Sequence, residues 1–212
     1  MNAIIIKQVC KSFRDKVVLD HVSAEMEEGK IHGLVGDNGS GKSVLLKCVC
    51  GLMPCDSGEI RVLDIPVRPG GAKQPQLGII IEHPGFLGSM SGWHNLKYLA
   101  GIRGKTTDEE IRSALERVNL VDAAKKRVGK YSLGMRQRLA IAQAIMEDPP
   151  MLIMDEPFNG LDKTAVASVR ALFLELKEKG KTLVLASHNP ADIDLLCDDV
   201  FEMENGKLNQ IR

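Results

Sequence analysis

One short segment constrains the fold of this 212-residue chain more than any other. Residues 36–43 read Gly-Asp-Asn-Gly-Ser-Gly-Lys-Ser, which fits the pattern G-x-x-x-x-G-K-S/T. A strand-like apolar run, residues 31–35, precedes the segment, and residues 44–51 have the pattern of a helix. In a strand, glycine-rich loop and helix of this order, the loop N–H groups and the positive end of the helix point at one place. The segment is therefore predicted to bind a phosphate group.

The residues of this loop have distinct tasks in a nucleotide site. Lys42 supplies a point charge for the β- and γ-phosphates, and the Ser43 hydroxyl can bind Mg²⁺. The segment expected to hold the phosphates consists of Gly36, Asp37, Asn38, Gly39, Ser40, Gly41, Lys42, Ser43 and Val44. An ordinary glycine-rich turn is the alternative, but the strand and helix that flank the loop favour a nucleotide site.

A second element of such a site follows the apolar strand-like run at residues 151–154. Two carboxylates, Asp155 and Glu156, end this run at the strand edge where ligands of open α/β sheets bind. Asp155 is expected to hold Mg²⁺, directly or through water, and Glu156 to polarise the attacking water as general base. Adjacent acids at a strand end can be merely solvated, but their position after a phosphate loop favours the hydrolytic role.

The remaining pattern predicts where regular structure lies. Alternating short runs indicate a β-rich N-terminal region, and residues 84–148 are mainly helical in pattern, with Thr107 as a capped helix start. Strands are expected at residues 4–9, 17–19, 22–26, 31–35, 76–81, 151–154 and 182–186, and helices at 44–51, 93–102, 107–118, 133–147 and 163–179, before a final hairpin.

This order of elements predicts an α/β fold. We expect a P-loop NTPase (RecA-like) core with an N-terminal antiparallel β region and an inserted helical subdomain. The prediction is one domain over residues 1–212, with the core at about 1–83 and 149–212 and the helical subdomain at about 84–148.

The segment at residues 131–138, Tyr-Ser-Leu-Gly-Met-Arg-Gln-Arg, resembles a diverged LSGGQ signature of ABC (ATP-binding cassette) ATPases. Ser132 and Gly134 match that signature, whereas Leu133 replaces a glycine and Met135 replaces a glutamine. Ser132 is also a reasonable helix N-cap, which is its structural alternative. The resemblance assigns Ser132, Gly134 and Met135 to binding ATP on a facing subunit. It implies a head-to-tail sandwich dimer with a second copy or a homologous ATPase.

Other residues match the ABC family in order along nearly the whole chain. The resemblance places Phe13 against adenine, although core packing is an alternative for this side chain. Residues 159–162 match the D-loop, which communicates between the two sites. His188 matches the switch histidine at the γ-phosphate, so the catalytic set becomes Glu156, His188 and Lys42.

One departure from the family pattern lies at Glu82, where a glutamine that senses Mg²⁺ is usual. A carboxylate can still bind Mg²⁺, which makes Ser43, Glu82 and Asp155 the expected metal ligands. The extra negative charge near the phosphates leaves the turnover rate open. Glu82 and the diverged signature together make the chain resemble the bacitracin and lantibiotic exporter and self-immunity branch of ABC ATPases.

The resemblance implies an ATPase with ATP and Mg²⁺ as cofactors, which drives transport through separate transmembrane permease subunits. Export of a peptide or drug-like compound is the expected direction. The surface at residues 82–90 is a candidate for docking the permease through Phe86 and Leu87, although both could be core residues. No apolar run approaches the ~20 residues of a membrane span, and no signal peptide is evident. We therefore expect a cytoplasmic protein that is peripheral on the inner face of the cell membrane through the permease.

Two other classes of function remain as alternatives. The first is a soluble ABC ATPase that acts on nucleic acid or ribosomes. The balance of 28 basic and 28 acidic residues argues against a nucleic-acid partner, as do the single cassette and the absence of a long heptad run. The second is a scaffold that binds ATP with little hydrolysis. Glu156 and His188 argue against it, whereas Glu82 and Leu133 keep it open.

Overall fold

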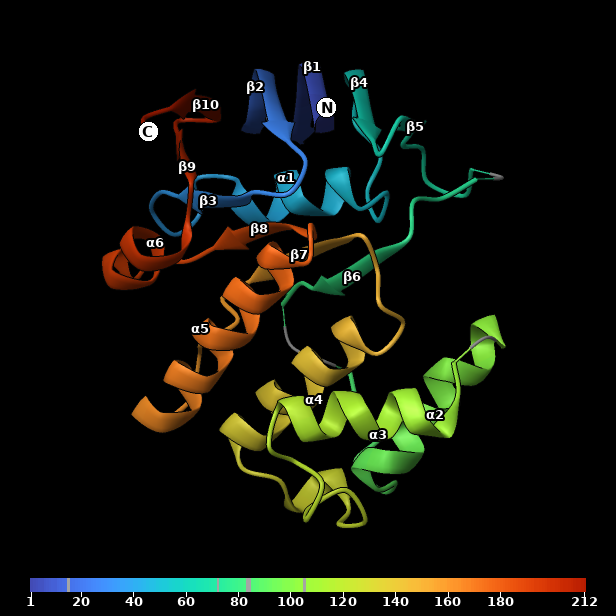
Figure 1. Cartoon of the computed structure of the whole chain (residues 1–212). Helices are drawn as coiled ribbons and strands as arrows, with labels where there is room; N and C mark the ends of the chain where they lie inside the picture. The colour runs from blue at the N-terminus through green and yellow to red at the C-terminus, as the bar shows by residue number, and fades with distance from the viewer. Residues whose placement is uncertain (15, 72, 83–84, 105) are drawn as a thin grey trace.

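Two stacked β-sheets with helix α1 between them form one half of the molecule, and the other helices cover the far face of the larger sheet (Figure 1). The computed structural model describes residues 1–14, 16–71, 73–82, 85–104 and 106–212. The expected boundary between core and helical subdomain falls at residues 83 and 84, which lie outside the described residues. The predicted α/β fold, with its N-terminal antiparallel region and inserted helices, is confirmed.

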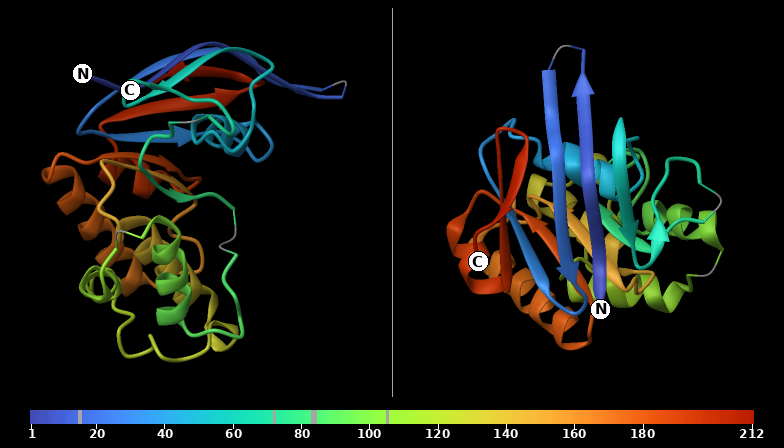
Figure 2. Two further views of the ribbon diagram at one scale, coloured as in Figure 1. Left: turned by 90° about the vertical axis from the view of Figure 1, so that its right-hand side faces the viewer. Right: turned by 90° about the horizontal axis from the view of Figure 1, so that it is seen from above.

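The smaller sheet is antiparallel and lies over α1 (Figure 2). Within the described residues its strands run in the order β2-β1-β4-β5. Their bounds are β1 Asn2–Phe13, β2 Lys16–Glu27, β4 Ser57–Val62 and β5 Ile65–Pro66. The two strands expected at residues 17–19 and 22–26 are in fact one strand, β2, which His21 interrupts with a φ of 49°.

The larger sheet has six strands in the described residues, in the order β10-β9-β3-β8-β7-β6. The pairs from β9 to β6 are parallel, and β10 is antiparallel to β9. The bounds are β3 Ile31–Val35, β6 Leu77–Ile80, β7 Met151–Asp155, β8 Thr182–Ala186, β9 Asp199–Glu204 and β10 Lys207–Gln210. The phosphate loop therefore follows a central strand, β3. Of the two acids, Asp155 ends β7 and Glu156 comes directly after it, and β8 lies between β3 and β7.

The helices are α1 Lys42–Val49, α2 Gly92–Arg103, α3 Asp108–Arg117, η1 Val128–Lys130, α4 Leu133–Ile145, α5 Lys163–Glu178 and α6 Pro190–Leu196. The capped start predicted at Thr107 is confirmed, because its hydroxyl accepts from Glu110 N and the Glu110 carboxylate accepts from Thr107 N. Helix α6 and strands β4 and β5 were not predicted. No described helix has the length and hydropathy that crossing a membrane requires.

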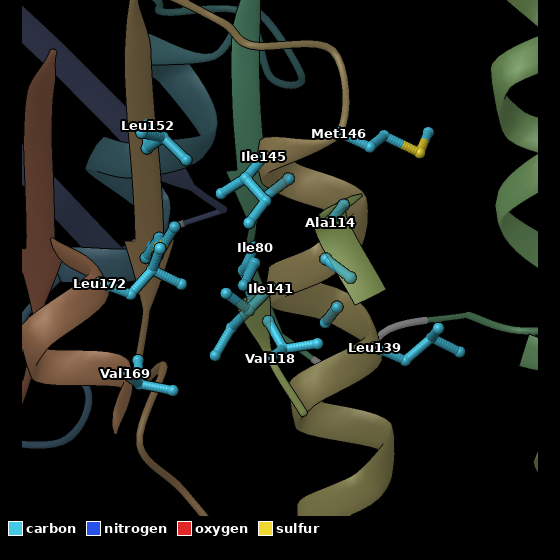
Figure 3. Close-up of a cluster of buried hydrophobic side chains, with 14 of the residues drawn as sticks. Ile80, Ala114, Val118, Leu139, Ile141, Ile145, Met146, Leu152, Val169 and Leu172 are labelled. Atoms are coloured by element: carbon cyan, nitrogen blue, oxygen red, sulfur yellow. The ribbon is translucent and has the colours of Figure 1, made fainter. Parts of the chain in front are cut away.

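Strand β7 is buried on both faces, and this explains its unbroken apolar sequence. Met151 and Ile153 belong to the cluster around α1, whereas Leu152 and Met154 belong to the cluster under α4 and α5. In the second cluster, side chains of α4 such as Ile145 point toward β6 and β7 (Figure 3). This packing fixes the end of β7, where the two acids begin.

Candidate nucleotide-binding and catalytic site

The loop between β3 and α1 leaves the start of α1 open to an anion. Gly41 precedes the helix with a φ of 116°, and among the described residues no side chain caps the first turn. A Cβ atom at Gly41 would lie 2.9 Å from the Val18 carbonyl oxygen, so the close approach of the β2 backbone also requires glycine. The N–H groups of the first helical turn thus face the loop without a side-chain acceptor.

Lys42 is nearly buried, and its ammonium group forms hydrogen bonds to the backbone of this loop. Its Nζ donates to the carbonyl oxygens of Gly36, at 2.6 Å, and Asp37, at 2.9 Å. These bonds satisfy a charge that burial would otherwise penalise. An ammonium has three N–H donors, so one phosphate oxygen can bind without displacing these bonds, and a second would have to replace one of them.

Ser43 and Asp155 meet across the site, one from α1 and one from the end of β7. The Ser43 hydroxyl donates to Asp155 Oδ2 at 2.6 Å. A hydroxyl and a carboxylate are hard oxygen donors of the kind that Mg²⁺ prefers. This pair therefore fits the divalent cation that accompanies a nucleotide.

Glu156 follows Asp155 and turns toward a different partner. Its φ of 50° is uncommon for a residue other than glycine, so the chain bends sharply after the strand. Glu156 Oε2 lies 2.8 Å from Nδ1 of His188, which follows β8. The structure thus brings together the two residues predicted as base and switch.

Glu82 also borders the site, in the lining that contains Ser43 and Asp155. Its carboxylate forms an ion pair with Lys47 on α1. The extra negative charge that the sequence places here is therefore partly balanced by a cation on the helix that follows the phosphate loop.

These groups line one cleft of about 660 Å³. The predicted site residues in its lining are Phe13, Asn38, Gly39, Gly41, Lys42, Ser43, Val44, Glu82, Asp155 and Glu156. Phe13 lies at the mouth of the cleft and is 44% exposed, so it is not a core residue. Gly36, Asp37, Ser40 and His188 line hollows that adjoin the same loop. The Ser40 hydroxyl is buried without a hydrogen-bond partner in the described part of the chain.

The signature segment lies beside the loop that follows β7. The Ser132 hydroxyl accepts from Met135 N at 3.2 Å, so Ser132 does cap α4. A Cβ atom at Gly134 would lie 2.7 Å from the Gly160 carbonyl oxygen, which explains glycine there. Leu133 borders the cleft, whereas the lining formed by described residues does not include Ser132, Gly134 or Met135.

Five residues in the lining of the cleft were not among the expected site residues: Val18, Leu133, Gln137, Asn159 and Gly160. Gln137 is buried on α4, and its amide donates to the carbonyl oxygens of Glu156 at 3.3 Å and Pro157 at 3.0 Å. It ties the signature helix to the catalytic loop. A polar residue on the otherwise apolar face of α4 was the available signal.

The comparison with protein families shows the family of this chain. The model of the ABC transporter family matches residues 19–159, which is more than half of the chain. The chain belongs to the ABC transporter family. As a member of it, the chain binds ATP and is an ATPase, in agreement with the loop and acids described above.

Curated relatives of this ABC ATPase include transport proteins of the expected branch. It is 38% identical to an uncharacterized ABC transporter ATP-binding protein, YybJ, of Bacillus subtilis, over 96% of this chain and 93% of that protein. The bacitracin transport ATP-binding protein BcrA of Enterococcus faecalis is 35% identical, over 95% of this chain and 66% of that protein. The lantibiotic transport ATP-binding protein SrtF of Streptococcus pyogenes is 32% identical, over 96% and 87%. The resemblance to this branch is confirmed.

Solved structures show that the whole ABC ATPase has the fold of the family. The dimeric post-hydrolysis state of the ATP-binding cassette MJ0796, bound to ADP and phosphate, matches with a TM-score of 0.90 over 99% of both chains at 20% identity. An ATP-binding subunit of an ABC transporter matches with a TM-score of 0.88 at 27% identity, over 99% of this chain and 90% of that one.

Proposed function

We propose that this chain is the ATP-hydrolysing motor subunit of an exporter, which drives a peptide or drug-like compound through separate transmembrane permease subunits. One observation carries the hydrolytic part of the proposal. The Glu156 carboxylate and the His188 ring lie 2.8 Å apart at the same sheet edge as the Ser43–Asp155 pair. The similarity to bacitracin and lantibiotic transport proteins supports the export part.

ATP binding begins with an exchange of partners at Lys42. Its ammonium leaves at least one of the carbonyl oxygens of Gly36 and Asp37 and donates to the β- and γ-phosphates, while the N–H groups at the start of α1 bind phosphate oxygens. Ser43 and Asp155, with Glu82 nearby, would hold Mg²⁺, which supplies positive charge to the phosphate oxygens. Phe13 at the mouth of the cleft stacks on the adenine.

Hydrolysis then depends on Glu156 and His188. Glu156 accepts a proton from the water that attacks the γ-phosphate in line with the leaving oxygen. The His188 ring holds the carboxylate in place. Its second role in this proposal is to donate to a γ-phosphate oxygen. Since phosphoryl transfer needs little covalent help, these two residues act through position and charge.

A second subunit completes each site in this proposal. Ser132, Gly134 and Met135 lie outside the lining that described residues give the chain's own cleft, which leaves them for contact with a facing copy. The Met135 N–H, which donates to the Ser132 hydroxyl, would have to exchange that acceptor for a phosphate oxygen. The dimeric cassette structures of MJ0796 support a sandwich of this kind. The facing subunit is a second copy or a homologous ATPase.

The permease is proposed to dock on the outer side of α2. A groove of about 230 Å³ lies between the edge strand β6, α2 and the end of α4, and Ile102 at its rim is 71% exposed. Tyr98, one turn earlier, and Leu87, before α2, are also exposed. Phe86 packs against the core, so of the two residues first expected to dock only Leu87 remains. This contact would hold the chain at the inner face of the cell membrane.

Replacing Ile102 by Glu is expected to lower the fraction of the chain that sediments with membranes of its own organism by about tenfold or more, because a charge would enter an apolar contact. The matched control is Leu195→Glu, which alters an exposed leucine on α6. Sedimentation of wild type and both variants measures the effect. Equal losses for Ile102→Glu and Leu195→Glu would exclude α2 as the docking surface.

Replacing Glu82 by Gln is expected to raise the Mg²⁺ concentration for half-maximal hydrolysis about tenfold, with kcat within about twofold of wild type. The amide keeps the shape of the side chain but removes the charge that attracts the cation. Phosphate release measured across a Mg²⁺ titration gives both values, with Glu59→Gln, an exposed carboxylate on β4, as the control. An unchanged Mg²⁺ dependence would exclude Glu82 as a Mg²⁺ ligand.

A further inference from the structure

The segment that carries Phe13 extends beyond the sheet to which it belongs. The pairing of β1 with β4 ends at Cys10 and Ser57, so within the described part of the chain residues 11–13 pair with β2 and not with β4. In the view from above, the β1–β2 hairpin projects past β4 (Figure 2). An aromatic ring on such a projection needs an additional support to hold one position.

Asp56 supplies a support from the loop just before β4. Its Oδ2 accepts from Ser12 N at 2.7 Å, and its Oδ1 accepts from Lys11 Nζ at 2.7 Å. The Asp56 N–H in turn donates to the Cys10 carbonyl oxygen at 2.9 Å. One residue therefore continues the sheet edge along the free side of β1. The bonds from Lys11 and Ser12 hold the pKa of Asp56 below its ordinary value, because both donors favour the charged carboxylate.

Lys11 connects this support to the aromatic ring. Its ammonium lies 5.5 Å from the centroid of the Phe13 ring, within the range of a cation–π contact. The Lys11 side chain is largely buried, with 12% of its surface exposed, so it is not a freely moving surface lysine. A cation held at one face of the ring leaves the other face for a flat ligand.

We propose that Lys11 and Asp56 are positioning residues that hold the Phe13 ring for stacking on the nucleobase of ATP. This inference rests on the proposed ATP site, because Phe13 borders the same cleft as Lys42 and Ser43. Asp56 fixes Lys11 and the backbone of Ser12, and Lys11 fixes the ring. Neither residue needs to touch the nucleotide.

The test is a comparison of two probes, ATP and inorganic tripolyphosphate, which keeps the phosphates but lacks the base. By calorimetry without hydrolysis, Asp56→Asn and Lys11→Met are each expected to weaken ATP binding about threefold to tenfold and to leave tripolyphosphate binding unchanged. The control is Lys97→Met, which removes an exposed ion pair with Asp108 on the helical side of the molecule. It should bind both probes as wild type does.

A double-variant cycle separates positioning from general destabilisation. If Asp56 and Lys11 act through the ring, Asp56→Asn adds no further loss of ATP affinity once Phe13 is Ala. Full additivity, or equal weakening of tripolyphosphate, would overturn the proposal. Equal affinity of the wild type for ATP and tripolyphosphate would also overturn it. Because these measurements need neither turnover nor a membrane partner, they are decided separately from the proposed transport function.

Discussion

Replacing Glu156 by Gln is expected to lower kcat for ATP hydrolysis by about 10²- to 10⁴-fold and to leave ATP affinity close to that of wild type. The amide has the shape of the carboxylate and can still meet the His188 ring, which lies 2.8 Å from Glu156 Oε2. It cannot accept the proton of the attacking water. Phosphate release and equilibrium dialysis with ATP measure the two quantities.

The same variant tests the sandwich dimer. With hydrolysis blocked, the ATP-bound state persists, so the mass in solution is expected to double when ATP and Mg²⁺ are added. Glu178→Gln, an exposed change at the end of α5, should behave as wild type in all three measurements. If the Glu156 variant hydrolyses ATP as fast as its parent, Glu156 is not the base. A wild type that binds ATP without releasing phosphate would favour the scaffold alternative.

Replacing Arg170 by Met is expected to lower the free energy of unfolding by about 3–5 kcal/mol. Nε and Nη2 of Arg170 both donate to Asp192 Oδ1, at 2.8 Å and 2.5 Å, and the Asp192 side chain is only 3% exposed. Without the guanidinium, the remaining side-chain partner among the described residues is the Ser187 hydroxyl at 3.5 Å. An almost unpaired charge would then stay buried between α5 and α6. Urea unfolding measures the loss.

The control for this prediction removes both charges. The double variant Arg170→Met/Asp192→Leu is expected to recover most of the lost stability, because no buried charge is left behind. Ser187 precedes His188, so the single variant should also hydrolyse ATP more slowly as the loop after β8 loosens. A loss below about 1 kcal/mol for Arg170→Met would show that water reaches Asp192 and that the pair behaves like a surface ion pair.

The sequence predicted those strands that are buried on both faces. Strand β8 was placed at its observed bounds, since all of its residues are buried and its sequence is almost wholly apolar. Strand β4 was missed because Gly58, Glu59 and Arg61 break its apolar pattern, and it exists through pairing with β1. Helix α6 was missed because it has only seven residues, starting at Pro190, and this is too few for the helical period to be recognised.

Part of the candidate site was likewise predictable from the sequence, and part of it was not. The phosphate loop and the two acids were predictable because each is a local motif whose geometry follows from adjacent residues. The contacts of Glu82 with Lys47 and of Lys11 with Asp56 join residues 35 and 45 positions apart, and no spacing rule reveals them. Gln137 needed the packing of α4 against the loop after β7 before its role could be seen.

The internal bonds of Lys42 bear on how the nucleotide leaves. Because the carbonyl oxygens of Gly36 and Asp37 already accept from the ammonium, an anion that reaches this loop does not meet an unsatisfied cation. Occupancy is then a competition between carbonyl and phosphate oxygens for the same donors, and its free energy is the difference between two comparable sets of bonds. Once the γ-phosphate is cleaved, the lysine has a ready place of return. The two carbonyl oxygens thereby lower the net affinity of the loop for any phosphate group, and this favours release of the products.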